Sequence, residues 1–277
     1  MSKTGQTPLL LNARQREILH TLHTTRFVST RQLATLLSRG LSTISRLLQP
    51  LRILHYVKRL DQVTHCPQGA DCAVYTLGPA GIEYVAAEFG VPERLRRRRA
   101  ERAASPLFVD HYLAIADVYI ALARATQTAG LDLEWHNELE ADFSYRYGRE
   151  EYRLSPDAIF WLDGATIPLT VAFLEVDRTT ESLKQWGQKL GDYARYARTQ
   201  AICAQWGRCP PRVLLLVTTL SPDRAETLRR YTAIKWRDKP ATRLFRVGFV
   251  VHAEVRPEQV LALPWQGLDD KMFRLIE

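Results

Sequence analysis

The sequence predicts a two-domain protein of the α+β or α/β class. A small N-terminal domain of helices with a β-hairpin comes first, and a larger domain with a mixed central sheet flanked by helices follows. Three observations lead to this prediction. The 277 residues are enough for two separate cores. Helical periodicity dominates the N-terminal third, and strand-length apolar runs separated by helical patterns fill the rest.

The composition is typical of an ordinary globular protein. Hydrophobic residues make up 46% of the chain and charged residues 25%, which are the proportions of soluble domains. No apolar run approaches membrane-spanning length, and the start MSKTGQTPLL has no signal-peptide core. We therefore expect a cytoplasmic protein with no membrane partner.

The N-terminal third carries three helical patterns and then two strand-like runs. Serine and threonine pairs precede two of the helices in the position of N-caps. The predicted elements are a helix over 13–24, a second helix capped by Ser29-Thr30, a third capped by Ser42-Thr43, strands over 56–60 and 73–77, and a helix from Pro79. Three helices followed by a β-hairpin is the order of a winged helix, which we predict for residues 1–92.

The segment HTTRFVSTRQLATLLSRGLSTISRLLQPLRILHYVKRL resembles winged helix-turn-helix regulators. The resemblance implies that the third helix enters the major groove of DNA. Lys58 and Arg59 are then expected to contact backbone phosphates. The residues expected to face the bases are the polar ones of the third helix: Ser42, Thr43, Ser45, Arg46 and Gln49. The alternative is that this domain pairs with another protein.

The distribution of charge favours DNA. Residues 1–103 hold sixteen Lys/Arg and seven Asp/Glu, a net charge of +9, whereas the remainder holds twenty-two and twenty-three. Such asymmetry is typical of a domain that binds a polyanion, here double-stranded DNA. Residues 93–102 contain six arginines and belong to a predicted linker over 93–106. Phosphate contacts are expected from Arg96, Arg97, Arg98 and Arg99, although a solvated charge run is the alternative.

The second domain is predicted for residues 107–277. Its pattern has consecutive strands and then a strand–helix–strand unit, which gives a mixed sheet flanked by helices. The expected elements are a helix from Asp110 to about Thr126, a strand over 131–143, a polar hairpin over 144–153, strands over 157–162 and 169–176, a helix from Leu183, a strand over 212–218, a helix over 224–235 and a strand over 244–251.

Three acidic residues occupy unusual places in this domain. Asp157 follows a proline at the start of one strand, and Glu175 and Asp177 end the next, two residues apart and therefore on one face. Burying several carboxylates together is electrostatically unfavourable. A divalent cation with oxygen ligands neutralises them, so the pattern predicts Mg²⁺ or Mn²⁺.

Pro156-Asp157, the triplet Glu175-Val176-Asp177 and the lysine-bearing helix that follows resemble the PD-(D/E)xK nuclease core. More narrowly, FLEVDRTTES at 173–182, with Lys189-Leu190 and Tyr193 after it, resembles the replication-relaxation family. That family is plasmid-encoded and akin to MobC-type mobilisation relaxases. The resemblance implies a restriction-endonuclease-like fold and a metal-dependent DNA nickase or relaxase in plasmid mobilisation or replication.

The resemblance also assigns roles to residues. Asp157, Glu175 and Asp177 become metal ligands and catalytic groups. The nuclease signature has a lysine two residues after its second acid, where this chain has Asp177. A lysine of the next helix, Lys184 or Lys189, is then expected to act. The two lie on opposite flanks of the apolar stripe of that helix, which is formed by Leu183, Trp186, Leu190, Tyr193 and Ala197. The helix before the first core strand adds three candidates: Asp110, His111 and Asp117.

Several alternatives stay open. Nicking through a covalent tyrosine would use Tyr145, Tyr147 or Tyr193, and no pattern singles one out. A non-catalytic DNA-binding accessory protein or regulator with a degenerate nuclease fold is the rival function. The oligomeric state also stays open. Winged helices often bind palindromic DNA as homodimers, but this sequence has no coiled-coil heptad that would enforce a dimer.

Two classes of cofactor are disfavoured. No Gly-rich phosphate loop is present, so no nucleotide cofactor is expected. Four cysteines form two pairs with five residues between the members: Cys66, Cys72, Cys203 and Cys209. Zinc pairs usually have two to four intervening residues, so reduced thiols are expected instead.

Overall fold

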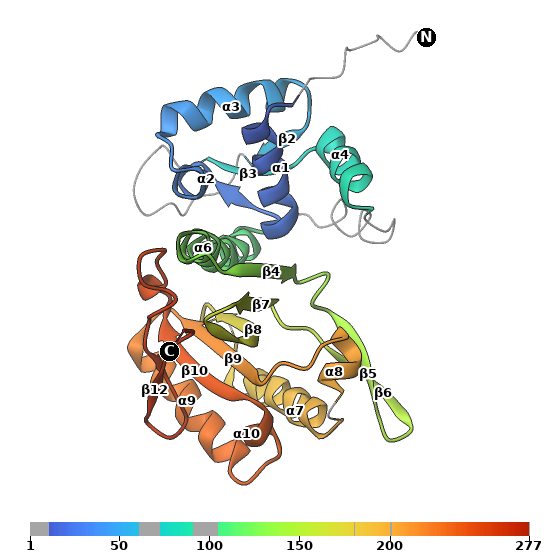
Figure 1. Cartoon of the computed structure of the whole chain (residues 1–277), viewed down its shortest axis with the longest axis vertical. Coiled ribbons are helices and arrows are strands. Elements are labelled where there is room, and N and C mark those ends of the chain that lie inside the picture. The colour runs from blue at the N-terminus through green and yellow to red at the C-terminus, as the bar shows by residue number, and fades with distance from the viewer. Residues whose placement is uncertain (1–10, 61–72, 91–104, 180, 200, 277) are drawn as a thin grey trace. The chain divides into compact units, whose positions relative to one another are not determined.

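The computed structural model describes residues 11–60, 73–90, 105–179, 181–199 and 201–276 (Figure 1). The chain forms two compact units, Met1–Ala116 and Asp117–Glu277, and the boundary falls inside helix α6 (Pro106–Ala129). Predictions for Arg96, Arg97, Arg98, Arg99, Cys66 and Cys72 lie outside the described residues.

The first unit consists of helices with a small sheet. Its helices are α1 (Ala13–Thr25), α2 (Thr30–Leu37), α3 (Leu41–Ile53) and α4 (Pro79–Phe89). An antiparallel sheet of order β1-β3-β2 is formed by Val28–Ser29, Val74–Leu77 and Val57–Leu60. The predicted helices and both predicted strands are present. Strand β1 was not predicted, because two residues are too few to give a recognisable strand pattern.

Capping decides where these helices begin. The side chains of Asn12 and Ser29 each accept a hydrogen bond from the backbone N–H of the residue three positions on, Gln15 and Gln32. The side chains of those glutamines accept a hydrogen bond from the backbone N–H of Asn12 and Ser29 in turn, so each pair forms a capping box. The predicted cap of α3 is wrong: its N-cap is Gly40, whose carbonyl accepts hydrogen bonds from the first turn. Ser42 and Thr43 therefore lie inside the helix.

Helix α6 corrects the expectation that no apolar run approaches membrane-spanning length. Among the described residues it is the one helix long and apolar enough to cross a membrane by length and composition. Half of its most apolar window is nevertheless buried inside the protein. Val109, Ile115 and Leu122 are almost fully buried, and Gln32 donates a hydrogen bond to the Leu113 carbonyl at 2.7 Å. Core packing therefore accounts for these apolar residues.

A seven-stranded mixed sheet of order β12-β11-β10-β9-β8-β7-β4 forms the second unit. Strands β8, β9 and β10 are parallel to one another, and the other neighbours are antiparallel. The strands are β4 (Asp132–Asn137), β7 (Ala158–Gly164), β8 (Ile167–Asp177), β9 (Arg212–Thr219), β10 (Arg246–Val251), β11 (Trp265–Gln266) and β12 (Met272–Phe273). The predicted mixed sheet flanked by helices is thus present, with β11 and β12 added at its edge.

Helices α7 (Leu183–Thr199) and α9 (Pro222–Trp236) pack against each other beside this sheet. Two buried indoles fix their contact: Trp186 donates to the Thr232 hydroxyl at 3.0 Å and Trp236 to the Leu190 carbonyl at 3.1 Å. The remaining elements are the hairpin β5 (Phe143–Tyr147) and β6 (Glu150–Leu154), the short helices α8 (Ile202–Trp206) and α10 (Ala241–Leu244), and the 3-10 turn η1 (His252–Glu254). The predicted strand over 131–143 is too long, since β4 ends at Asn137 and a turn follows.

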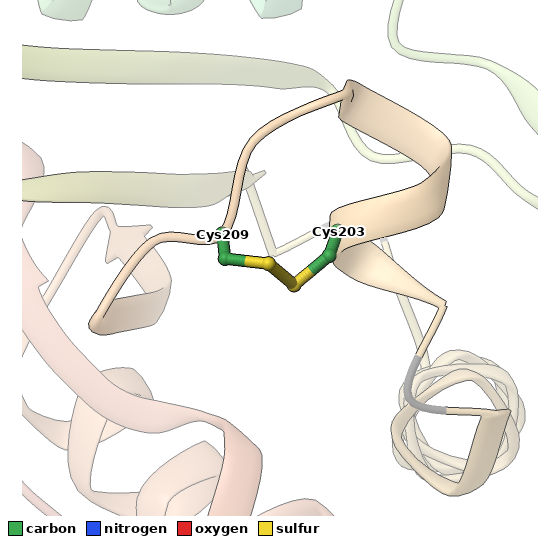
Figure 2. The surroundings of a disulfide bond; sticks show 2 residues. All are labelled: Cys203 and Cys209. Carbon is green, nitrogen blue, oxygen red and sulfur yellow. A yellow bond between two sulfur atoms is a disulfide. The ribbon is translucent and has the colours of Figure 1, made fainter.

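Cys203 and Cys209 form a disulfide, which corrects the expectation of reduced thiols for this pair (Figure 2). Their Cα atoms are 4.5 Å apart, a separation at which disulfides form. The single turn of α8 and the left-handed Gly207 after it bring the chain back on itself. The five residues between Cys203 and Cys209, too many for a usual zinc pair, therefore form a short loop that the disulfide closes.

Candidate functional site

Strand β8 places two of the predicted acids. Its last eight residues are buried, and Glu175 and Asp177 are 2% and 6% exposed. Alternation along the strand directs both side chains to the face on which α7 and α9 contribute their partners. Two carboxylates therefore lie at the carboxyl end of a central parallel strand.

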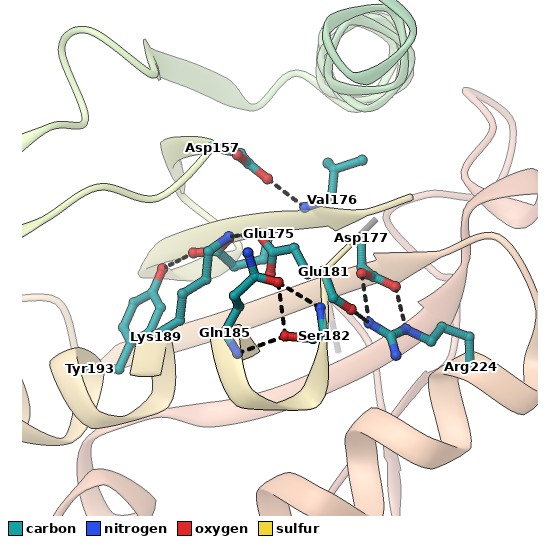
Figure 3. A network of polar contacts seen from close by, with 10 residues as sticks. All are labelled: Asp157, Glu175, Val176, Asp177, Glu181, Ser182, Gln185, Lys189, Tyr193 and Arg224. Atoms are coloured by element: carbon teal, nitrogen blue, oxygen red, sulfur yellow. Dashed lines mark hydrogen bonds and ion pairs between the residues drawn. The ribbon is translucent and has the colours of Figure 1, made fainter. Parts of the chain in front are cut away.

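Glu175 is held by two residues of α7 (Figure 3). Lys189 donates from Nζ to Oε2 at 2.7 Å, and Tyr193 donates its hydroxyl proton to Oε1 at 2.7 Å. Lys189 and Tyr193 are four residues apart, so they lie on one face of the helix, one turn from each other. Lys189 also pairs with Glu181 at 2.7 Å.

Asp157 lies beside the same strand end. Its Oδ2 atom accepts a hydrogen bond from the Val176 backbone N–H at 2.7 Å, and its own N–H donates to the Leu174 carbonyl at 3.0 Å. These bonds fix Asp157 on the side of the β8 ribbon to which Val176 points, while Glu175 and Lys189 lie on the other side, as Figure 3 shows. The charge of Asp157 raises the pKa values of both Glu175 and Lys189. Asp157, Glu175 and Lys189 therefore form one electrostatic group.

Burial is the largest single influence on the pKa values of Glu175, Lys189 and Tyr193. It raises the pKa of the Glu175 carboxyl to about 7, although Lys189 acts in the opposite direction. Burial also lowers the pKa of Lys189, but the carboxylates of Glu175, Asp157 and Glu181 outweigh that effect and raise it overall. Burial and then Glu175 hold the pKa of Tyr193 well above its ordinary value. Lys189 is therefore charged and Tyr193 a neutral donor near pH 7.

Asp177 has a different partner. Both of its carboxylate oxygens accept hydrogen bonds from Arg224, at 2.7 and 3.0 Å, and Arg224 also donates to the Glu181 carbonyl at 2.6 Å. Arg224 comes from the first turn of α9, so this ion pair ties the end of β8 and the turn before α7 to a second helix. Sequence reasoning missed Arg224, because it lies 47 positions away.

The two candidate lysines are separated by the fold. Lys189 reaches the acids, whereas Lys184 is exposed on another side of α7. Of the three candidate tyrosines, Tyr193 contacts the acids. Tyr145 donates to the Asp192 carbonyl, and Tyr147 lies on the exposed part of the hairpin.

The three additional candidates lie on α6, which the boundary between the two units divides. Asp110 and His111 belong to the first unit, and the His111 ring contacts Tyr112. Asp117 Oδ2 lies 3.3 Å from His252 Nε2, and His252 Nδ1 lies 3.3 Å from the Thr218 hydroxyl. His252 was not among the residues that the sequence singled out.

The residues expected to contact DNA lie where solvent reaches them. Helix α3 buries Ile44, Leu48 and Leu51 and turns its polar side outward. The predicted contact residues are all exposed except Thr43, which is half-buried: Ser42, Thr43, Ser45, Arg46, Gln49, Lys58 and Arg59. Gln49, Lys58 and Arg59 also line a shared hollow of about 630 Å³.

The donor set decides which metal the site suits. Across the described ranges, no group of three His, Cys, Asp or Glu side chains forms a ready metal site. Asp157 and Glu175 are carboxylate donors of the kind that Mg²⁺ takes, but a cation on Glu175 has to displace Lys189 or Tyr193, which bond its two oxygens, just as Arg224 bonds both oxygens of Asp177. Mg²⁺ commonly binds through one or two carboxylates and keeps several waters, so this pair suits Mg²⁺ or Mn²⁺.

Comparison with known proteins gives one match. The family model described as replication-relaxation matches residues 19–211, which include Asp157, Glu175 and Lys189 but not Arg224. No curated protein and no solved structure matches the chain.

Proposed function

The chain belongs to the replication-relaxation family, and from that membership and the acidic site we propose that it is a DNA-binding protein that nicks plasmid or mobile-element DNA with Mg²⁺ or Mn²⁺. The placement of Asp157 and of the Glu175–Lys189 pair at the same end of β8 carries the proposal. Two acids and a lysine at a strand end are the groups that phosphodiester cleavage needs: ligands for a cation and a positive charge near the phosphate.

The finer fold assignment is part of this proposal. We assign residues 1–92 to a winged-helix domain, 93–106 to a linker that lies mostly outside the described residues, and 107–277 to a restriction-endonuclease-like domain, whereas the compact units divide ten residues later, between Ala116 and Asp117. The order of three helices and a β-hairpin supports the first assignment. Antiparallel β7 and β8, then α7 and the parallel strand β9, support the second.

Asp157 and Glu175, with the backbone carbonyl of Val176, are the residues that would hold the cation. When bound, the cation polarises the phosphodiester and lowers the pKa of an attacking water. Lys189 is placed to stabilise the negative charge that develops on the phosphorus oxygens. It takes the role that the nuclease signature gives to a lysine at the position of Asp177.

Asp177 then has a positioning role. Its ion pair with Arg224, and the bond from Arg224 to the Glu181 carbonyl, hold the turn that leads into α7. That turn sets where α7 begins and therefore where Lys189 lies relative to Glu175.

The first unit supplies DNA binding in this proposal. The exposed polar side of α3 reads the major groove, and Lys58 and Arg59 contact phosphates. The excess of sixteen Lys/Arg over seven Asp/Glu in residues 1–103 supports a polyanionic partner.

A non-catalytic replication accessory protein is the second candidate. Both oxygens of Glu175 and both oxygens of Asp177 already have partners within the protein, as expected of a fold kept as a scaffold. The two functions differ in their response to metal.

Nicking of a supercoiled plasmid that carries the cognate element tests the choice. Wild type, Asp157→Ala and Lys189→Ala would be assayed with Mg²⁺ or Mn²⁺ and with EDTA, beside Asp163→Ala as a control at an exposed acid. The nickase is supported if wild type and Asp163→Ala give open-circle product that requires metal, and Asp157→Ala and Lys189→Ala give none. Duplex binding without product from any protein supports the accessory protein.

A further inference from the structure

A cavity of about 870 Å³ lies in the second unit away from the acidic site. Arg212 and Arg246, the first residues of β9 and β10, contribute to its wall. Arg212 is in register with Thr170 of β8, five residues before Glu175. At roughly 3.3 Å per residue the cavity is therefore about 17 Å from the acids along the strand. It is a separate site of a size that accommodates a small organic ligand.

The wall of the cavity is strongly basic. Its single carboxylate, Asp269, lies 3.5 Å from a lysine of the same wall. The cations are Arg212, Arg237, Arg243, Arg246 and Lys271. Residues 104–277 hold twenty-two Lys/Arg and twenty-three Asp/Glu, so without the cavity residues the rest of this range is acidic, and the positive charge is concentrated at the cavity.

Two of the arginines are fixed over an apolar floor. The Arg246 guanidinium lies 4.3 Å from the centre of the Phe273 ring, and Arg212 donates to the Leu275 carbonyl at 2.7 Å. Phe245 and Phe273 are 2% and 3% exposed. An arginine plane above an aromatic ring is a surface on which a nucleic-acid base stacks.

Arg237 and Arg243 are positioned differently. Both are exposed at the cavity, and within the part of the chain that the structure describes neither has a carboxylate partner. Exposed guanidinium groups that have no carboxylate partner bind phosphate oxygens well, because they present several donors in a fixed plane.

We propose that this cavity binds a nucleotide of an unpaired DNA strand, with its base stacked on the Arg246 guanidinium and its phosphates on Arg237 and Arg243. Arg237 and Arg243 together carry more positive charge than one phosphodiester neutralises, which favours a strand with successive phosphates, and the chain has no Gly-rich phosphate loop for a free nucleotide. The choice of DNA among phosphorylated ligands rests on the proposed function. Binding of an unpaired strand does not require that the acidic site be active.

Fluorescence anisotropy of a labelled oligothymidylate, with the full chain and in EDTA, tests this site. The double variant Arg237→Gln/Arg243→Gln should bind about tenfold more weakly and lose roughly 1.4 from the slope of log affinity against log salt. The matched control is Arg149→Gln/Arg256→Gln, which loses the same charge from exposed positions outside the cavity. It should change binding by less than about twofold.

Equal weakening in the two double variants, or none in either, would overturn the proposal. EDTA prevents cleavage, so a nicking assay that fails with every protein leaves this result unaffected. Duplex binding by the cavity variant should equal that of wild type. Tryptophan fluorescence shows whether a variant is folded, because all six tryptophans lie in residues 117–277.

Discussion

Lys189 of α7 donates a hydrogen bond from Nζ to Oε2 of Glu175 at the end of β8, at 2.7 Å. The bond joins the helix to a carboxylate whose side chain is only 3% exposed. It also places a positive charge at the strand end where Asp157 lies. This contact brings a lysine to Glu175 although the residue at the usual sequence position is Asp177.

Removing the lysine should cost more stability than neutralising the acid. Lys189→Ala leaves a buried carboxylate without its charged donor, so the second unit should lose roughly 1–3 kcal/mol of unfolding free energy. Glu175→Gln keeps an acceptor for Lys189 and a partner for Tyr193, so it should change the unfolding free energy by less than about 1 kcal/mol. Urea titration followed by tryptophan fluorescence measures both. Equal losses would show that the charge of Glu175 is not what Lys189 stabilises.

Metal binding should depend on pH through Glu175. Its pKa is about 7, above the ordinary 4.5, so between these values the folded state keeps a proton that the unfolded state has lost. Stability from this group is fully present below about pH 4.5 and is lost as the pH rises through about 7. A cation needs the ionised form, so thermal stabilisation by Mn²⁺ should be small near pH 5.5 and larger near pH 8.

Glu175→Gln and Asp157→Asn serve as the variants for that measurement, with Asp163→Asn as the control. The first two should show no Mn²⁺ response at either pH, and the control should behave as wild type. A response that survives in Asp157→Asn would remove this residue from the metal site.

Asp177 and Arg224 should behave as a coupled pair. Each oxygen of Asp177 is bonded to the guanidinium, and the two side chains are 4% and 15% exposed. Asp177→Asn and Arg224→Gln should each cost about 2 kcal/mol, and the double variant little more than either. A double-mutant cycle by urea unfolding measures the coupling. Strictly additive losses would mean that the two residues stabilise the protein independently.

The first unit should separate base recognition from phosphate binding. Arg46→Ala, on the exposed side of α3, should weaken binding to the cognate duplex by roughly 1–3 kcal/mol and relax its sequence preference. Lys58→Ala should weaken all duplexes alike and reduce the salt slope by about 1. Gel-shift titrations with cognate and scrambled duplexes measure both. Uniform effects from both variants would argue against α3 as the reading helix.

Local sequence patterns determined much of the second unit. The apolar stripe of α7 is buried as its helical spacing predicted at Trp186, Leu190, Tyr193 and Ala197, but Leu183 at its start is 37% exposed. The strand that follows Asp157 and the strand that carries Glu175 lie within a few residues of their predicted bounds. These features depend on residues close in sequence, where side-chain periodicity and turn residues fix which face is buried.

The sequence by itself determined that acids end a buried strand and that a lysine-bearing helix follows. Only the tertiary structure decided that Lys189, and not Lys184, pairs with Glu175. It also decided that Arg224 pairs with Asp177 and that His252 contacts Asp117. Each of those outcomes depends on how a helix is rotated against the sheet or on partners far apart in the chain. Packing of the whole core sets both, and no local pattern encodes them.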